Sequence, residues 1–113
     1  MAKTVFKRII EGDIPAQIVY DDDLCMAFHD VSPVAPIHIL VIPKKEIRCL
    51  DDLVSEDAAL LGHIMLVIAK LAKERNLNQG YRVVTNCGPH GGQSVDHLHF
   101  HLLAGRQMEW PPG

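Results

Sequence analysis

A single long stretch of this chain has the pattern of an amphipathic helix, and this pattern restricts the fold more than any other feature. Between Ser55 and Arg75, apolar residues recur at helical spacing. Ser55 is the predicted N-cap, and basic residues up to Arg75 suit the C-terminal end of the helix dipole. One long helix has one apolar stripe to cover, so other segments must supply the surface against which it packs. The stripe consists of Leu60, Leu61, Ile64, Val67, Ile68, Leu71 and Ala72.

The segments that can supply this surface are short and rich in β-branched residues, which predicts strands. The predicted strands are residues 18–20, 24–28, 37–42, 81–85 and 97–103. Thr4 is predicted to cap a short helix over residues 5–10 that ends at Gly12. The order of these elements lacks the strict strand–helix alternation of a doubly wound fold. We therefore expect an α+β fold: an antiparallel five-stranded sheet with one long and one short helix.

The length and composition fit one small globular domain. Of the 113 residues, 48% are hydrophobic and 22% are charged. No repeat or Gly/Ser-rich linker divides the chain, so we expect a single domain over residues 1–113. A core of this size has little stability to spare, which makes a dimer interface a natural supplement. The net charge of −3 argues against binding to nucleic acid or to a membrane surface.

The three cysteines, Cys25, Cys49 and Cys87, are odd in number and far apart in the sequence. No Cys-x-x-Cys pair occurs among them, so we expect a reducing compartment rather than a disulfide framework. The longest apolar stretch, around residues 37–42, is far too short to span a bilayer. The protein is therefore expected to be soluble and cytoplasmic.

Histidines alternate with apolar residues over residues 96–103. Because strand side chains alternate between faces, His97, His99 and His101 are predicted to share one face. Leu98 and the apolar residues after it would point into the core beneath the long helix. Three histidines in this pattern have three interpretations: a nucleophile oriented by its neighbours, a metal site, or a polar face without chemistry. The strand alone favours the first two equally.

Two further observations weigh against a metal. The Cα atoms of the first and third histidines would be about 13 Å apart, which is awkward for one tetrahedral ion. The loop over residues 86–94 holds three glycines, whose backbone N–H groups can approach a phosphate closely. The same loop has the alternative interpretation of a flexible hairpin, and it is not a P-loop. His38 either reaches the histidine face or merely caps its strand, and spacing leaves both open.

Residues 97–103, His-Leu-His-Phe-His-Leu-Leu, resemble the signature of the histidine-triad (HIT) family. Further similarity to the Hint branch of this family extends over nearly the whole chain. It lies at residues 28–33, 35–36, 38, 41–45, 80–82, 91–94 and 105–113. The resemblance implies a HIT-like fold whose sheet continues across a homodimer. The long helix and the strand near residues 81–85 would lie at the interface, with the C-terminus reaching toward the partner's active site.

The resemblance also implies an activity. Hint proteins bind purine mononucleotides and cleave the P–N bond of nucleoside phosphoramidates through a nucleotidyl-histidine intermediate, with no metal and no other cofactor. The expected substrate is therefore a purine nucleoside monophosphate derivative, such as adenosine 5′-phosphoramidate. The alternative is a nucleotide-binding or regulatory module of the same fold with little catalysis.

The same resemblance implies roles for individual residues. His99 would be the nucleophile, and His97 would orient it through its backbone carbonyl. His101 and His38 would support the phosphate, the leaving group and the proton network. Base, ribose and phosphate would be bound by Phe6, Ile14, Phe28, Asp30, Val31, Asn86, Gly92, Gln93 and Ser94.

Two places depart from the family pattern and bear on the rate of reaction. Asp96 precedes the triad, and its charge is expected to raise the pKa of a nearby histidine. Pro89 and His90 are expected to make the glycine loop stiffer and more basic.

Overall fold

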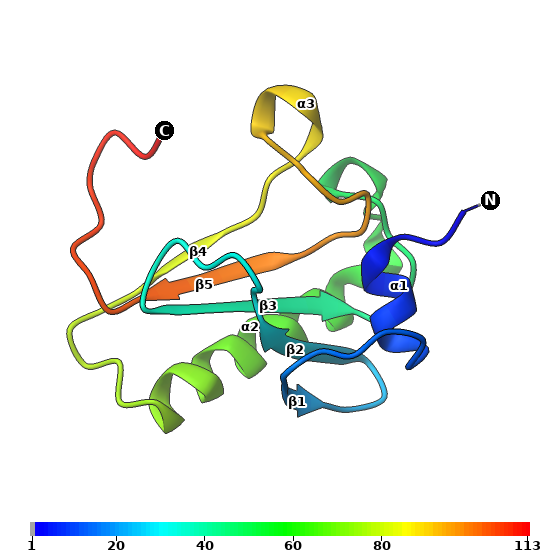
Figure 1. Ribbon diagram of the computed structural model, residues 1–113. Coiled ribbons are helices and arrows are strands. Elements are labelled where there is room, and N and C mark those ends of the chain that lie inside the picture. Colours follow the sequence, from blue (N-terminus) through cyan, green and yellow to red (C-terminus); the bar gives the residue numbers. More distant parts are fainter. Residues whose placement is uncertain (1) are drawn as a thin grey trace.

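The computed structural model describes residues 2–113, and within this range it contains three helices and five strands (Figure 1). The helices are α1 (Val5–Ile10), α2 (Ala58–Glu74) and α3 (Gly88–Gly91). The strands are β1 (Ile18–Asp21), β2 (Cys25–His29), β3 (Ile37–Pro43), β4 (Arg82–Val84) and β5 (Phe100–Ala104). Two 3-10 turns, Leu50–Asp52 and Ser55–Asp57, precede α2. None of the helices described is long and apolar enough to cross a membrane.

All five strands pair antiparallel in one sheet, in the order β1-β2-β3-β5-β4. β3 is the central strand, and its Leu40 lies opposite Phe28 of β2 and His101 of β5. β1 and the short β4 form the two edges. The expected α+β architecture with an antiparallel five-stranded sheet is therefore confirmed.

The two faces of this sheet are covered by helices of very different length (Figure 1). α2, with 17 residues, packs its apolar stripe against one face and closes the larger core. Leu98, Phe100 and Leu102 belong to this core, as their alternation predicts. α1 has only 6 residues and packs in a smaller cluster with Phe6 and Phe28 on the other face. That face is therefore left with room for a pocket.

The short helix begins and ends as predicted. The Oγ1 atom of Thr4 accepts a hydrogen bond from the backbone N–H of Lys7 at 3.1 Å. Gly12 follows the helix with a φ of 78°, a left-handed conformation that glycine adopts without strain.

The long helix begins later than predicted. Ser55 is not its N-cap, because the Ser55 hydroxyl bonds to the neighbouring Glu56 carboxylate. The carboxylate of Asp57 instead accepts from the backbone N–H of Val54 at 3.1 Å. This bond tightens residues 55–57 into a 3-10 turn, and the α-helix starts at Ala58.

The histidine segment and the glycine loop also differ from prediction. β5 begins at Phe100, so only His101 of the three histidines lies in a strand. The backbone N–H of Leu98 bonds to the carbonyl of Ile47, beyond the end of β3, so the segment has already left the sheet there. The glycine loop contains the short helix α3, because Pro89 suits a first helical turn and Gly92 ends it with a φ of 79°.

Candidate active site

His99 is buried and held by three groups. Its Nδ1–H donates to the carbonyl of His97 at 2.7 Å, and the hydroxyl of Thr85 donates to the carbonyl of His99 at 2.8 Å. The ring of Phe6 meets the imidazole edge-on, with centroids 5.0 Å apart. Since a carbonyl only accepts, Nδ1 must carry the proton, which leaves Nε2 with a free lone pair. This is the tautomer that a nucleophilic imidazole needs.

His97 supports this arrangement from beneath. Its Nε2–H donates to the carbonyl of Pro43 at 2.7 Å, and only 2% of the residue is exposed. Burial lowers the pKa of His97, although the bond to Pro43 works in the opposite direction. The raised pKa expected of a histidine near Asp96 is therefore not found at His97, because burial has the larger effect.

His38 reaches the histidine face, which the sequence spacing left open. Its Nδ1 accepts from the backbone N–H of Val34 at 3.1 Å, so its Nε2 carries the proton and donates to Nδ1 of His101 at 2.8 Å. His101 must then be protonated at Nε2. This nitrogen is buried and has no hydrogen-bond partner within residues 2–113. Because the rings of His101 and His99 are 5.0 Å apart, the unpaired N–H is a donor for a ligand bound at His99.

Asp30 completes this network. One carboxylate oxygen lies 3.4 Å from Nε2 of His38, and the other accepts from the backbone N–H of Ser32 at 2.7 Å. Burial lowers the pKa of His38, and burial with the neighbouring histidines lowers that of His101 to about 4, while Asp30 opposes both shifts. Both imidazoles are therefore neutral at pH 7.

A cavity of about 300 Å³ opens beside His99 and His101. Its walls are mainly apolar and come from α1, the segment that follows α1, and the strands β2 and β3. Polar groups enter at Asp30 and Ser94. The apolar lining includes Phe6, Ile9, Ile14, Phe28, Val31, Leu40 and Val95. A mainly apolar cavity with a few polar groups is typical of a small-molecule binding site.

The remaining predicted residues lie outside this cavity. His97 and His38 stand behind His99 and His101, which line the cavity together with His29. The side chain of Gln93 is already bonded within the protein: it donates to the carbonyls of Arg48 at 2.7 Å and Val95 at 2.9 Å and accepts from the N–H of Gly88. Gly92 ends α3 and does not line the cavity.

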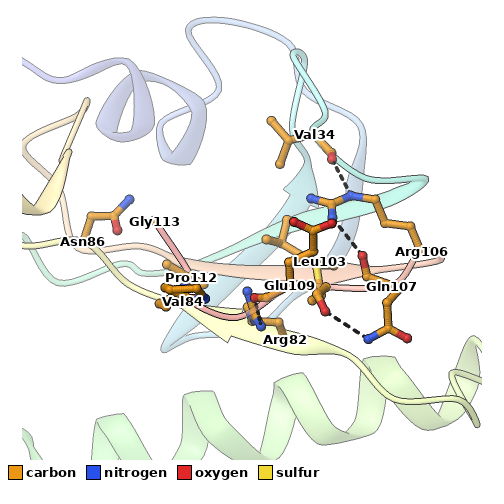
Figure 2. Close-up of a pocket in the computed structure, with 12 residues that line it drawn as sticks. Val34, Arg82, Val84, Asn86, Leu103, Arg106, Gln107, Glu109, Pro112 and Gly113 are labelled. Carbon is orange, nitrogen blue, oxygen red and sulfur yellow. Dashed lines mark hydrogen bonds between the residues drawn. The ribbon is translucent and has the colours of Figure 1, made fainter.

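Asn86 lines a second cavity, of about 690 Å³, between β4 and the C-terminal segment (Figure 2). Arg82 donates to the carbonyl of Glu109 at 2.9 Å, and Arg106 donates to the carbonyl of Val34 at 3.0 Å. These bonds hold the C-terminal segment across the cavity. No histidine lines this cavity, in contrast to the first.

One set of metal-binding groups coincides with this site. Within the described residues, Asp30, His38 and His101 bring one ligand atom each within 4.8 Å of one another. This set is not the three-histidine set considered from the strand pattern. A metal ion here would have to replace the hydrogen bond between His38 and His101.

Sequence reasoning missed Thr85 and the backbone carbonyl of Pro43, which orient His99 and His97. A β-branched residue at the end of a strand is ordinary, and a backbone carbonyl carries no sequence signal. The Thr85 contact depends on how β4 pairs with β5, and the Pro43 contact depends on how β3 pairs with β5, so neither could be found from spacing alone.

Comparison with known proteins finds relatives that are similar over nearly the whole chain. The family model of the HIT domain matches residues 11–108. An uncharacterized HIT-like protein of Synechococcus elongatus is 56% identical over 110 residues, which are 97% of this chain and 96% of the relative. The crystal structure of a HIT family hydrolase from Legionella pneumophila superposes with a TM-score of 0.96 and 46% identity, covering 98% of this chain and 100% of that one. A histidine triad nucleotide-binding protein from Candida albicans gives 0.82 and 32%, over 96% of this chain and 83% of that one.

Proposed function

This chain belongs to the HIT domain family, and from that premise we propose that it is a hydrolase of the Hint branch. Its proposed reaction is cleavage of the P–N bond of adenosine 5′-phosphoramidates and related purine nucleotides. The observation that carries the proposal is the tautomer of His99, fixed by His97, next to the unpaired N–H of His101. The similar proteins from Legionella and Candida are a hydrolase and a nucleotide-binding protein by name. We place the activity in the cytoplasm, where the three free thiols would stay reduced.

The proposed first step uses the free lone pair of His99. Its Nε2 attacks the phosphorus, a new N–P bond forms, and the bond from phosphorus to the amine breaks. The amine leaves with a proton, which the hydroxyl of Ser94 can relay from water because Ser94 lines the same cavity. In the second step, water attacks the phosphorus, an O–P bond forms, and the N–P bond to His99 breaks. The proton that this water loses returns through Ser94 and replaces the one given to the amine, so the nucleoside monophosphate leaves and His99 regains its free lone pair.

His101 and His38 would act on the phosphate oxygens in both steps. The Nε2–H of His101 has no partner within the described residues, so it can donate to an oxygen as negative charge grows there. His38 and Asp30 keep His101 in the tautomer that donates, which makes them positioning residues. Of the glycine loop, Ser94 lines the cavity, whereas the backbone N–H groups of Gly88, Gly92 and Gln93 bond within the loop.

The 300 Å³ cavity would hold the nucleoside. We propose that Phe6, Ile14, Phe28 and Val31 surround the purine and that Asp30 accepts hydrogen bonds from the ribose hydroxyls. Asn86, Gly92 and Gln93 remain proposed nucleotide-binding residues from the resemblance, and because they lie outside the cavity, Ser94 is the better supported contact.

We also propose a homodimer. α2 exposes Met65 and Leu66, the latter to 72%, and exposed Tyr81 and Val83 lie at or beside the edge strand β4. Pairing of this edge with a second copy would cover these side chains and continue the sheet. Leu66→Glu should therefore yield monomers in light scattering, whereas Leu24→Glu, at the β1–β2 turn, should not. A wild-type chain that is monomeric at micromolar concentration would contradict the dimer.

The deciding experiment compares hydrolysis of adenosine 5′-phosphoramidate by the wild type and His99→Ala, each with and without EDTA. We expect activity to survive EDTA and to disappear in the variant. His63→Gln is the matched control, because His63 is a histidine of α2 that lies outside the cavity. Loss of wild-type activity in EDTA would favour a metal at Asp30, His38 and His101. An inactive wild type that still binds AMP would favour the alternative, a nucleotide-binding module.

A further inference from the structure

Two of the three cysteines, far apart in the sequence, meet in the fold beside the glycine loop. Cys49 immediately precedes the 3-10 turn Leu50–Asp52, and Cys87 immediately precedes α3. Their sulfur atoms and a carboxylate oxygen of Asp51 all lie within 4.8 Å of one another. Cys49 is completely buried, whereas Cys87 is partly exposed. The thiol of Cys87 is therefore accessible to solvent, and the buried thiol of Cys49 lies next to it.

The chain segments that carry these thiols are already held together. The side chain of Gln93 donates to the carbonyl of Arg48, next to Cys49, and accepts from the N–H of Gly88, next to Cys87. The two cysteines therefore keep their separation while both thiols are free. The third cysteine, Cys25, lies elsewhere, with its thiol directed at Asp22. It offers a matched control for any chemistry at the pair.

We propose that Cys49 and Cys87 form a redox-active dithiol whose substrate is a hydroperoxide, and that the resulting disulfide restrains the glycine loop. The thiolate of Cys87 attacks one peroxide oxygen; an S–O bond forms, the O–O bond breaks, and the alcohol or water leaves with a proton. The sulfur of Cys49 then attacks that of Cys87. An S–S bond forms, the S–O bond breaks, and water leaves with the proton of Cys49. The two thiols lose two electrons, which the peroxide gains.

The pKa of Cys87 determines how much reactive thiolate is present and therefore the rate of the first step. Its interaction with the thiol of Cys49 raises the pKa of Cys87, while the backbone N–H of Asp51 works in the opposite direction. Cys87 is thus a slowly reacting thiol whose resolving partner lies within 4.8 Å. This proximity favours the disulfide over further oxidation, because the second step needs no diffusion of a partner.

The disulfide would join the segment after β3 to the start of the glycine loop. It would close a covalent loop that contains α2 and β4, adding a bond where Gln93 now supplies hydrogen bonds. Both the disulfide and the restraint follow from the position of the pair, and neither depends on the proposed function.

The test treats the reduced full-length chain with hydrogen peroxide in EDTA and measures intact mass and peptide maps. We expect a monomeric chain that has lost two hydrogens and a cross-link between the peptides of Cys49 and Cys87. Cys25→Ser should behave identically, and Cys87→Ser should form no intramolecular link. Since Cys87 is partly exposed, its serine variant should fold even if Cys49→Ser does not. Free thiols after treatment, a link between two chains, or a sulfinic acid at Cys87 without a link would overturn the dithiol.

Hydrogen exchange tests the restraint in the same samples. The N–H groups of Gly92 and Gln93 bond within the loop, to the carbonyls of Pro89 and Gly88. They should exchange more slowly in the oxidised chain than in the reduced chain, and Cys87→Ser should show no change with peroxide. Equal exchange rates in a chain shown to carry the disulfide would overturn the restraint.

Discussion

The core beneath α2 and the candidate site lie on opposite faces of the sheet, and each contains one of two neighbouring residues. The two regions differ in the contacts that hold these residues. Leu98 and His99 are adjacent and almost fully buried, at 0% and 2% exposed. Leu98 packs among the aliphatic side chains beneath α2. His99 is held by a hydrogen bond and by the edge of one aromatic ring. Burial alone therefore does not distinguish the core of this protein from its candidate site.

The two regions do differ in whether their polar groups have hydrogen-bond partners within the protein. Between the β1–β2 turn and α2, Asp22 accepts from His63 at 2.6 Å, from Tyr20 at 2.7 Å and from two backbone N–H groups. In the site, by contrast, Nε2 of His101 is buried with no partner in residues 2–113. A structural network satisfies its own donors, whereas a site keeps one donor for a ligand.

The largest effect is expected from His99→Ala. Loss of the nucleophile should reduce the hydrolysis of adenosine 5′-phosphoramidate by about a thousandfold or more. The free energy of unfolding should fall by only about 1 kcal/mol, since one hydrogen bond is lost. Single-turnover kinetics and urea denaturation measure the two effects. A variant that retains a tenth of wild-type activity would show that another group is the nucleophile.

Leu98→Ala should give the opposite result. Removing a fully buried leucine from the α2 core should lower the free energy of unfolding by about 2–5 kcal/mol. The folded fraction should keep most of its turnover, because Leu98 faces away from the cavity. Urea denaturation and activity per folded molecule decide the outcome. If both neighbouring variants lost activity and stability together, the division between the two faces would be wrong.

Acid should destabilise the site before it affects the α2 side. His101 has the ordinary pKa of 6.5 in the unfolded chain, but burial lowers its pKa to about 4 in the folded chain. Between these two values, His101 is protonated in the unfolded state and neutral in the folded state. The unfolded state then holds more protons, so the free energy of unfolding falls as the pH falls from 6.5 toward 4. His38 and His97, whose pKa values are also lowered by burial, contribute in the same direction.

Asp22 should respond only at lower pH. Burial works against ionisation of its carboxyl, but hydrogen bonds from Tyr20, Cys25 and His63 hold the pKa far below the ordinary 3.8. Its contribution is therefore complete above about that value and is lost only as the pH falls further. Urea denaturation at a series of pH values should show the first loss between 6.5 and 4, reduced in His101→Asn. A constant free energy of unfolding over that range would contradict the neutral histidines.

The sequence predicts contacts between residues that are close along the chain better than contacts between residues that are far apart. The alternation that places Leu98 in the core follows from a period of two, and Thr4 caps α1 as its residue type predicts. The pairing of His38 with His101 depends on the register of β3 against β5, which spacing does not contain. Ser55 is not the N-cap of α2, because its hydroxyl bonds to Glu56 while the carboxylate of Asp57 accepts from the N–H of Val54. Tautomers, which decide the chemistry, depend on such non-local partners.

The smallest expected effect tests one of these non-local partners. The hydroxyl of Thr85 donates to the carbonyl of His99 and so fixes the backbone that carries the proposed nucleophile. Thr85→Val keeps the shape but leaves that carbonyl unpaired, which should cost about 1 kcal/mol of stability. Because the imidazole would be less well positioned, kcat should fall a few-fold while KM changes little. Thr85→Ser keeps the hydroxyl and should restore kcat. If the valine variant lost stability but kept the wild-type kcat, the bond from Thr85 would stabilise the fold without positioning His99. Thr85 would then be a structural residue, like those of the core beneath α2.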